Sequence, residues 1–516
     1  MTRPDEARPS GTKRDRPTGG RFATGPRRPL RRARHPRGTA PVRRRALPTR
    51  VRGATVEDAR RRRRRCGVYP RSRRGGLYGG SQATPAGRSA GEEGSGRMRH
   101  GAELSGEVPD SPGRLPKRAH VALMEIGMHG HVTPTLAVAR ELLARGHRVT
   151  YVVPEAFASL VAETGADVVP FRSAWGPADD SLKLLKDFTS IVSYMLDEAE
   201  NALPQVRQAL DEDRPDVILH DLFAYEARVL GHEWGVPAVA FWPFAVDYEG
   251  KTNGIAAVYR GLLTDAATSR LRDRFSRWLA ENSVEMPLDR FGLRPERGVS
   301  SIPRSLQPHA DAVDESVFSF VGPCLGDRAE LGTWQPPSDE RPVLLMSLGS
   351  TFTNRPDIYR RCVADFGRSD WHVVLQTGKF VDRGMLGDVP DNVEVHQWLP
   401  QVEVLSHATA FITHAGMGGT VEALAHEVPM LALPQGADQF FIADRLVELG
   451  VGRRLDNDAV ATTGLRGPLE ELLALPQLTR RLALLGQEIR ACRGAQAAAD
   501  IVEEALVPTA RASRRS

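Results

Sequence analysis

Short apolar runs alternate with amphipathic segments along most of the chain after residue 117. The first apolar run covers residues 118–126 and is followed by a helical spacing whose buried stripe consists of Leu136, Ala139, Leu142 and Leu143. Gly146 ends that helix, and residues 148–153 form the next apolar run. A strand, a helix and a second strand in this order predict a parallel sheet with a right-handed crossover.

The alternation occurs in two sets. The first set continues with strands predicted at 215–219 and 237–241 and a helix at 227–234. The second set has strands predicted at 342–348, 371–375, 393–395, 408–413 and 430–433, and ends in leucine-rich helices over 466–506. We therefore predict an α/β fold with two doubly wound, Rossmann-like domains facing across a cleft, at residues 118–325 and 342–507, joined by a linker at 326–341.

The charge is distributed unevenly along the chain. Residues 1–100 contain 29 Lys and Arg and 7 Asp and Glu, a balance of +22, whereas the whole chain has 70 minus 64, or +6, so that the remainder carries −16. An acidic body argues against nucleic-acid binding by the folded part. Residues 1–117 are rich in Arg, Pro and Gly and predict a disordered leader, and 508–516 a disordered tail. A sensor whose leader binds nucleic acid is one alternative function.

The cysteine pattern and the lack of long apolar segments indicate where in the cell the protein is located. Cys66, Cys324, Cys362 and Cys492 are widely spaced and form no CxxC pair, which is typical of reduced thiols in a cytoplasmic protein. The sequence has no run of 18 apolar residues that predicts a membrane span, and the leader lacks the apolar core of a signal peptide.

The clearest chemical signal follows the strand predicted at 408–413. This strand runs into His414-Ala415-Gly416-Met417-Gly418-Gly419, and helical spacing resumes at Thr420. Glycines let the backbone approach a ligand, and the N–H groups at a helix N-terminus attract anions. The pattern predicts a phosphate site, with an ordinary turn between strand and helix as the alternative. The expected contacts are His414, Gly416, Gly418, Gly419 and Thr420.

The flanking residues extend this site toward a nucleotide sugar. The Trp398 indole can stack on a base, the Gln401 amide can contact the base edge, and the Glu422 carboxylate can accept hydrogen bonds from ribose hydroxyls. Other polar residues follow predicted strands at their carboxyl ends, where open α/β sheets bind ligands. These are Ser350 and Thr351 after the first strand of the second set, and Asp438 and Gln439 after the strand at 430–433.

The pattern W-x-P-Q, then H-x-G-x-x-x-T-x-E, then P and D-Q resembles the donor-binding signature of the UDP-sugar glycosyltransferases with the GT-B fold. Residues 120–507 resemble the macrolide glycosyltransferase branch of that family. The resemblance implies a UDP-sugar as co-substrate, most simply UDP-glucose, and a macrolide-like acceptor, with no separate cofactor and no metal. The sequence departs from the plant form of the signature at Ala415, Met417, Gly418 and Gly419.

His131 is the candidate catalytic base. It precedes a helix for which Thr133 is the expected N-cap and Pro134 the first residue, so that the helix dipole favours a neutral imidazole. Asp221, at the end of another strand, can hold the second ring nitrogen. The GHxxP and D-[LI]-x-x-Y patterns of the family match these two positions. The alternatives for His131 are a hydrogen-bonded turn and a metal ligand shared with His129.

Bulky side chains near the expected crevice favour an apolar acceptor. Met128, Phe223, Tyr225 and Trp242 are the candidate acceptor contacts, although each also fits an ordinary core position. The sequence predicts an inverting hexosyltransferase, and the family resemblance implies that it modifies a macrolide hydroxyl and so inactivates an antibiotic. A biosynthetic transferase that attaches a deoxysugar to a polyketide, and a nucleotide-sugar epimerase or hydrolase, are the alternatives.

Overall fold

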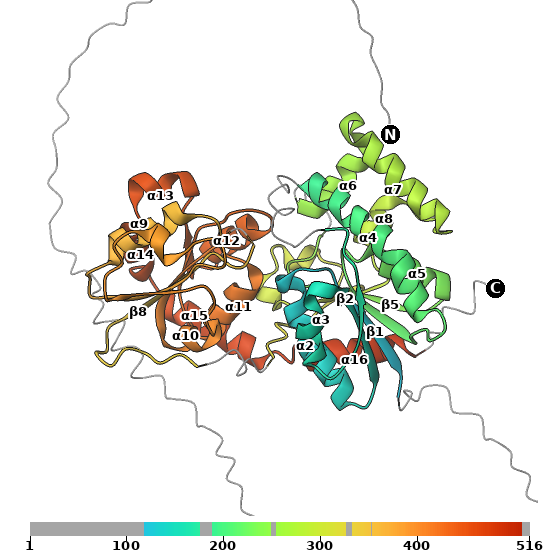
Figure 1. Ribbon diagram of the computed structural model, residues 1–516, viewed down its shortest axis with the longest axis horizontal. Coiled ribbons are helices and arrows are strands. Elements are labelled where there is room, and N and C mark those ends of the chain that lie inside the picture. The colour runs from blue at the N-terminus through green and yellow to red at the C-terminus, as the bar shows by residue number, and fades with distance from the viewer. Residues whose placement is uncertain (1–117, 176–187, 249–253, 327–332, 352, 508–516) are drawn as a thin grey trace, which may run out of the picture. The chain divides into compact units, whose positions relative to one another are not determined.

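The computed structural model of the protein describes residues 118–175, 188–248, 254–326, 333–351 and 353–507, which contain two parallel sheets (Figure 1). The strand order is β3-β2-β1-β4-β5-β6-β7 in the first sheet and β10-β9-β8-β11-β12-β13 in the second. In each sheet the order reverses once, between β1 and β4 and between β8 and β11. Open α/β sheets bind ligands at such switch points, beyond the carboxyl ends of the strands.

The first sheet and its helices occupy the described part of the chain up to residue 326. The strands are β1 (His120–Met124), β2 (Arg148–Pro154), β3 (Asp167–Phe171), β4 (Val217–Asp221), β5 (Ala238–Trp242), β6 (Arg297–Ser300) and β7 (Phe318–Phe320). The helices are α2 (His129–Ala144), α3 (Ala158–Ala162), α4 (Phe188–Leu210), α5 (Tyr225–Trp234), α6 (Gly254–Thr264), α7 (Ser269–Glu281) and α8 (Leu288–Leu293).

The second sheet begins at residue 343. Its strands are β8 (Val343–Ser347), β9 (His372–Gln376), β10 (Val393–His396), β11 (Ala408–Thr413), β12 (Met430–Ala432) and β13 (Gly452–Arg454). The helices are α9 (Pro356–Phe366), α10 (Gln401–His407), α11 (Met417–Ala425), α12 (Gln439–Glu448), α13 (Asn457–Thr463), α14 (Arg466–Leu473), α15 (Leu478–Ala491) and α16 (Ala495–Ala505).

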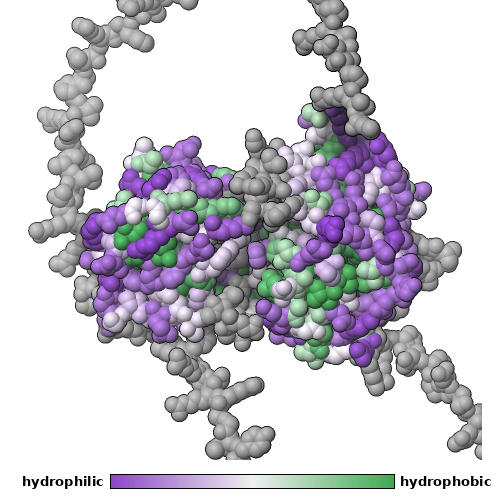
Figure 2. All heavy atoms as spheres, in the orientation of Figure 1, coloured by the Kyte–Doolittle hydropathy of each residue, from purple (hydrophilic) through white to green (hydrophobic). Residues whose placement is uncertain are grey.

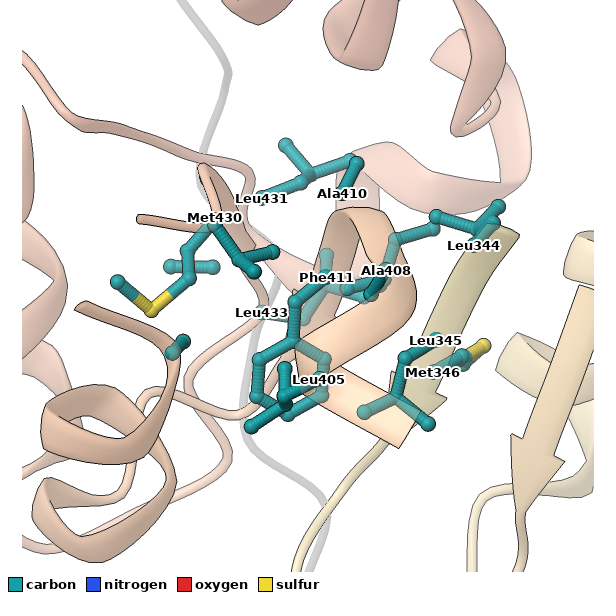
Figure 3. Close-up of a cluster of buried hydrophobic side chains, with 14 of the residues drawn as sticks. Leu344, Leu345, Met346, Leu405, Ala408, Ala410, Phe411, Met430, Leu431 and Leu433 are labelled. Atoms are coloured by element: carbon teal, nitrogen blue, oxygen red, sulfur yellow. The ribbon is translucent and has the colours of Figure 1, made fainter. Parts of the chain in front are cut away.

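Both faces of each sheet are covered, so the central strands are buried and mostly apolar. In the first sheet, alternate residues of β1 enter two separate cores: Val121 and Leu123 pack against α2, whereas Ala122 and Met124 pack on the side of α4 and α5. The core of the second sheet gathers around β8, β11 and β12, where Phe411 lies among leucine and methionine side chains (Figure 3). The fold class predicted from the sequence is confirmed.

Several predicted boundaries differ from the structure. The strand predicted at 408–413 has the predicted limits, and most other strands are shifted by one or two residues. Four strands were not predicted, namely β3, β6, β7 and β13, because they are short or lie at a sheet edge, where half-exposed positions weaken the apolar pattern. The predicted leader at 1–117 and tail at 508–516, and residues 327–332 of the predicted linker, lie outside the described residues.

The last helix does not follow the predicted division of the chain. Helix α16 packs against α2, and Ala498, Ala499, Ile501 and Val502 belong to the same core as β1 and β2. Ion pairs reinforce this contact, because Arg145 at the end of α2 donates to Asp500 at 2.8 Å and to Glu503 at 2.7 Å. The chain therefore returns to the first sheet after completing the second.

The outer surface of the described domains is mostly hydrophilic on the face shown in Figure 2. Within the described ranges, none of the helices combines the length and the apolar character that crossing a bilayer requires.

Candidate active site

The chain turns from β1 into α2 earlier than the sequence suggested. Helix α2 begins at His129 with Met128 as the N-cap residue, so the expected N-cap at Thr133 is wrong and Pro134 lies inside the helix. The N–H groups of His131 and Val132 both donate to the Met128 carbonyl, which closes the first turn before Pro134 is reached. His131 is consequently the third residue of the helix, inside the turn where the positive end of the dipole acts.

His131 and Asp221 are in direct contact, as predicted. The His131 Nδ1 atom lies 2.6 Å from Asp221 Oδ2, and the side chains are almost wholly buried. The other carboxylate oxygen of Asp221 accepts a hydrogen bond from the Phe223 N–H at 2.8 Å. Because a carboxylate accepts the Nδ1–H bond, the neutral ring carries its lone pair on Nε2. The arrangement provides a base whose orientation is fixed from behind.

A cavity of about 1470 Å³ connects this pair to the second sheet. Residues that follow β1, β4 and β5 line one part of the cavity, and residues that follow β8, β11 and β12 line another. Its volume exceeds the range of about 300–1,000 Å³ typical of a pocket for one drug-sized ligand. The cavity is large enough for two substrates side by side.

The N-terminus of α11 opens into this cavity. The first turn has no side-chain cap and no acidic residue, and the first intrahelical bond in the turn runs from the Thr420 N–H to the Gly416 carbonyl. Gly416, Met417, Gly418 and Gly419 line the cavity with this free helix end. Such an end attracts the negative charge of a phosphate group.

Glycines on both sides of the His414 ring make room for it. A Cβ atom built on Gly416 would lie 2.3 Å from His414 Nε2, and one built on Gly349 would lie 2.5 Å from the same atom. The backbone φ of Gly416 is −68°, so close approach rather than backbone conformation requires glycine here. Burial lowers the pKa of His414 to about 4, and the ring is therefore neutral near pH 7.

We expect Gly416→Ala to weaken UDP binding about 5- to 150-fold, because inserting a methyl group into a tightly packed site typically costs about 1–3 kcal/mol. The methyl would push the His414 ring toward Gly349, which has no space for it. Titration calorimetry with UDP measures the effect. Gly467→Ala in α14 is the matched control, since a Cβ there meets nothing within 4 Å. Wild-type affinity in Gly416→Ala would contradict the prediction.

The residues expected to hold the nucleoside line the cavity together. The Trp398 side chain is 56% exposed and is free to present its indole face to a ligand. The Gln401 amide donates to Glu422 Oε2 at 2.7 Å, so the two side chains are held as a unit. Glu422 is buried at the base of this group.

Four more predicted donor contacts also line the cavity. Ser350 and Thr351 follow β8, and Asp438 and Gln439 lie at the start of α12. The Gln439 side-chain oxygen accepts from the N–H groups of Gln435, at 2.8 Å, and Gly436, at 3.1 Å. That oxygen holds the loop between β12 and α12, and only the amide nitrogen of Gln439 is left for a sugar hydroxyl.

Three predicted contacts are placed elsewhere. Thr420 is fully buried behind the first turn of α11 and does not line the cavity. Tyr225 and Trp242 are buried in the core between the first sheet and α4, and the Tyr225 hydroxyl accepts from Tyr259 at 2.8 Å. They were proposed on proximity in sequence to Asp221 and β5. Neither side chain lines the cavity.

Met128 and Phe223 lie where they were predicted, at the cavity wall beside the pair. The His131 ring is 6.1 Å from Phe223 and 5.9 Å from Phe244, measured between ring centroids. The sequence did not reveal the apolar wall that α2, α3 and α4 contribute to the cavity. Its members are Leu136, Leu160, Ile191 and Met195.

His129 has a different environment from His131. Its ring packs on Phe157 with 4.9 Å between centroids, whereas the His131 ring faces Asp221. Burial, together with the nearby Lys379 charge, lowers the pKa of His129. Two imidazoles that point to different partners do not form a shared ligand pair.

Comparison with known proteins gives consistent matches over the described domains. Residues 319–485 match the model of the family described as UDP-glucoronosyl and UDP-glucosyl transferase. The oleandomycin glycosyltransferase of Streptomyces antibioticus is 44% identical over 391 residues, which cover 75% of this chain and 91% of the relative. The demethyllactenocin mycarosyltransferase of Streptomyces fradiae is 32% identical over 406 residues, covering 76% of this chain and 88% of that protein.

Solved structures agree with these relatives. The glycosyltransferase of kitacinnamycin is 42% identical with a TM-score of 0.70, and the match covers 76% of this chain and all of that one. A calicheamicin glycosyltransferase is 31% identical with a TM-score of 0.67, covering 77% of this chain and all of that one. Two parallel sheets that share one cavity, together with these matches to glycosyltransferases, define a glycosyltransferase with the GT-B fold. The chain belongs to the UDP-glycosyltransferase family, and it is an enzyme.

Proposed function

We propose that this enzyme transfers a hexose, most simply glucose from UDP-glucose, to a hydroxyl group of a macrolide or a similar apolar natural product, with inversion at the anomeric carbon. The observation that carries the proposal is the 2.6 Å contact between His131 and Asp221 at a cavity that also receives the N-terminus of α11. A base and an anion site at one cavity are what this transfer needs.

In the proposed reaction, His131 Nε2 takes the proton of the acceptor hydroxyl. The acceptor oxygen forms a bond to the anomeric carbon as the bond from that carbon to the UDP oxygen breaks. UDP leaves with the bonding electron pair, and Asp221 stabilises the imidazolium. Attack from the face opposite UDP converts an α-linked donor into a β-glycoside.

The donor is proposed to lie along the second sheet. Trp398 would stack on uracil, and Glu422, held by Gln401, would accept from ribose hydroxyls. The helix N-terminus at Gly416–Gly419 would take the diphosphate, with Ser350, Thr351 and the neutral His414 as hydrogen-bonding neighbours. The Asp438 carboxylate and the Gln439 amide nitrogen would bond to sugar hydroxyls, which favours a hexose over a deoxysugar.

The acceptor is proposed to lie against the apolar wall near His131. Met128, Phe223, Phe244 and the side chains contributed by α4 present a largely hydrocarbon surface. The relative from Streptomyces antibioticus is by name an oleandomycin glycosyltransferase, which supports a macrolide acceptor. Glycosylation of a macrolide hydroxyl would inactivate the antibiotic.

A second candidate is a biosynthetic transferase that attaches a deoxysugar to a polyketide. The 32% identity to a mycarosyltransferase favours it. Incubation with UDP-glucose or a TDP-deoxysugar, each with a panel of macrolides, separates the two by product mass. A gain of one hexose from UDP-glucose supports our proposal, and product only from the TDP-deoxysugar overturns it.

The two remaining alternative functions, an epimerase or hydrolase and a nucleic-acid sensor, predict different results in activity and binding assays. An epimerase or hydrolase would consume the donor when no acceptor is present, whereas a transferase requires both. A sensor whose leader binds nucleic acid would lose binding on deletion of residues 1–97, whereas the proposed transferase would keep its activity. Donor consumption followed with and without acceptor, in the full chain and in the deletion variant, distinguishes these functions.

A further inference from the structure

The cavity wall beside His131 includes a segment without regular secondary structure. Residues 243–248, here called the 243–248 loop, follow β5 and form neither helix nor strand, yet Phe244, Asp247 and Tyr248 line the cavity. The Phe244 ring lies 5.9 Å from the His131 ring, measured between centroids. Because no helix or strand pairs the backbone of this loop, its buried polar groups need partners from elsewhere in the chain.

Gln307 supplies these partners at the middle of the loop. Its side-chain oxygen accepts a hydrogen bond from the Val246 N–H at 2.9 Å, and its amide nitrogen donates to the Val246 carbonyl at 3.1 Å. The same nitrogen donates to the Pro308 carbonyl at 3.0 Å. Val246 is fully buried and Gln307 is only 1% exposed, so water does not replace these bonds in the folded protein. One side chain therefore pairs both backbone groups of Val246, as a neighbouring strand would.

The segment that carries Gln307 is itself anchored to the second domain. It follows β6, and its Ile302 and Leu306 side chains are buried in the core of the second sheet. Arg445 of α12 donates to the Ser305 carbonyl through Nη2 at 2.7 Å and through Nε at 3.2 Å. A side chain whose own backbone is held in this way can fix the position of the loop that it contacts.

We propose that Gln307 is a positioning residue for the acceptor site, and that it determines acceptor affinity by holding the 243–248 loop in the shape of the cavity wall. The inference rests on the function proposed above, because it takes the wall beside His131 as the surface for the acceptor. Without the bonds from Gln307 the loop adopts other shapes, and the acceptor binds only the fraction of molecules in which the wall is formed. The loss therefore falls on acceptor binding rather than on donor binding or on the chemical step.

Steady-state kinetics of Gln307→Met test the proposal, because methionine has nearly the same length and cannot make these hydrogen bonds. The assay uses UDP-glucose and the macrolide of the panel that gives the most product. The acceptor KM is expected to rise about tenfold, which corresponds to about 1.4 kcal/mol and lies within the cost of leaving buried polar groups unpaired. The kcat and the KM for UDP-glucose should stay within about threefold of wild type, since saturating acceptor restores the wall.

Hydrogen exchange followed by mass spectrometry gives a second measurement, which does not depend on activity. In wild type the Val246 N–H is bonded to a buried side chain, so the peptide that covers the 243–248 loop should contain a slowly exchanging amide. In Gln307→Met this amide should exchange about tenfold faster or more. A raised acceptor KM with unchanged exchange would mean that Gln307 contacts the acceptor directly without holding the loop, and the proposal would be overturned.

Asn392→Leu is the matched control. Asn392 is also a buried amide that holds a loop, since it donates to the carbonyls of Phe366 and Trp371 at 2.9 Å and accepts from the Arg368 N–H at 2.8 Å. None of these residues lines the cavity. The control should show a comparable fall in Tm, while its acceptor KM and the exchange of the 243–248 loop stay as in wild type. An equal rise of the acceptor KM in both variants would reflect general destabilisation and would overturn the proposal.

The outcomes separate this inference from the function beneath it. If wild type glycosylates no macrolide of the panel, the proposed acceptor is wrong, and the exchange of Val246 still decides whether Gln307 holds the loop. If wild type is active while Gln307→Met keeps the wild-type acceptor KM, only the role of Gln307 is overturned, whatever the exchange shows. Gln307→Glu serves if the methionine variant does not fold, because its carboxylate can still accept from the Val246 N–H but cannot donate. The expected combination is faster exchange in the loop, a raised acceptor KM and an unaltered kcat.

Discussion

Replacing His131 by alanine is expected to lower the kcat of glycosyl transfer about 10²- to 10⁴-fold, the usual contribution of a general base. The imidazole is the group at the cavity wall that is held by a carboxylate from behind, at 2.6 Å, and that has an unengaged nitrogen to receive a proton. Measurement of product formation with UDP-glucose and a macrolide acceptor gives the ratio.

Binding of UDP to His131→Ala should stay within about threefold of wild type, since the proposed donor contacts belong to the domain of the second sheet. Calorimetry provides this control. Equal loss of transfer and of UDP affinity would mean that the substitution disturbs the cavity as a whole. In that case His131 could not be assigned the role of base.

Replacing Asp221 by asparagine is expected to lower kcat by up to about 10⁴-fold, although the side chain keeps its shape. Asp221 Oδ1 accepts from the Phe223 N–H, so an asparagine oxygen would take that place and the amide NH2 would face His131 Nδ1. Nδ1 would then have to accept, and the ring proton would move to Nε2. The nitrogen directed to the acceptor would lose its lone pair.

This variant has a distinct kinetic signature. The kcat should fall while the KM for UDP-glucose changes little, because the altered proton does not contact the donor. Thermal unfolding checks that the variant is folded. A kcat within tenfold of wild type would show that the tautomer of His131 is not set by Asp221.

The sequence was most informative where a strand ends. His131, Asp221, Ser350, Thr351 and His414 were all predicted from apolar runs that stop at polar or glycine residues. In the structure, His131, Ser350, Thr351 and His414 line the cavity, and Asp221 contacts His131. The reason is topological, since the carboxyl ends of parallel strands meet at one edge of a sheet. No side-chain orientation had to be known for that prediction.

Side-chain direction was the weakest part of the prediction. Tyr225 follows Asp221 closely and Trp242 ends β5, yet their side chains lie in the core with α4. Thr420 is fully buried and does not line the cavity. The N-cap of α2 is Met128 and not Thr133 as predicted, which shows the same difficulty at a helix end. Such directions depend on where a turn closes, and apolar periodicity does not fix that within a few residues.

The cavity wall formed by α2, α3 and α4 could not be predicted from the sequence, for a different reason. Residues such as Leu160, Ile191 and Met195 look like ordinary positions of amphipathic helices. They become cavity residues only because the second sheet does not cover them. Exposure to the cavity depends on the placement of two sheets, and no local sequence pattern indicates it.

The packing of helix α16 restricts where this enzyme can be joined to a relative in a chimaera. Its apolar side chains complete the core beneath β1 and β2, although it follows the whole second sheet in the chain. A chimaera joined once, near residue 330, would pair a foreign final helix with the native first domain and create a mismatched contact at Ala498 and Val502. Exchange of donor specificity therefore requires two junctions, the second before residue 495.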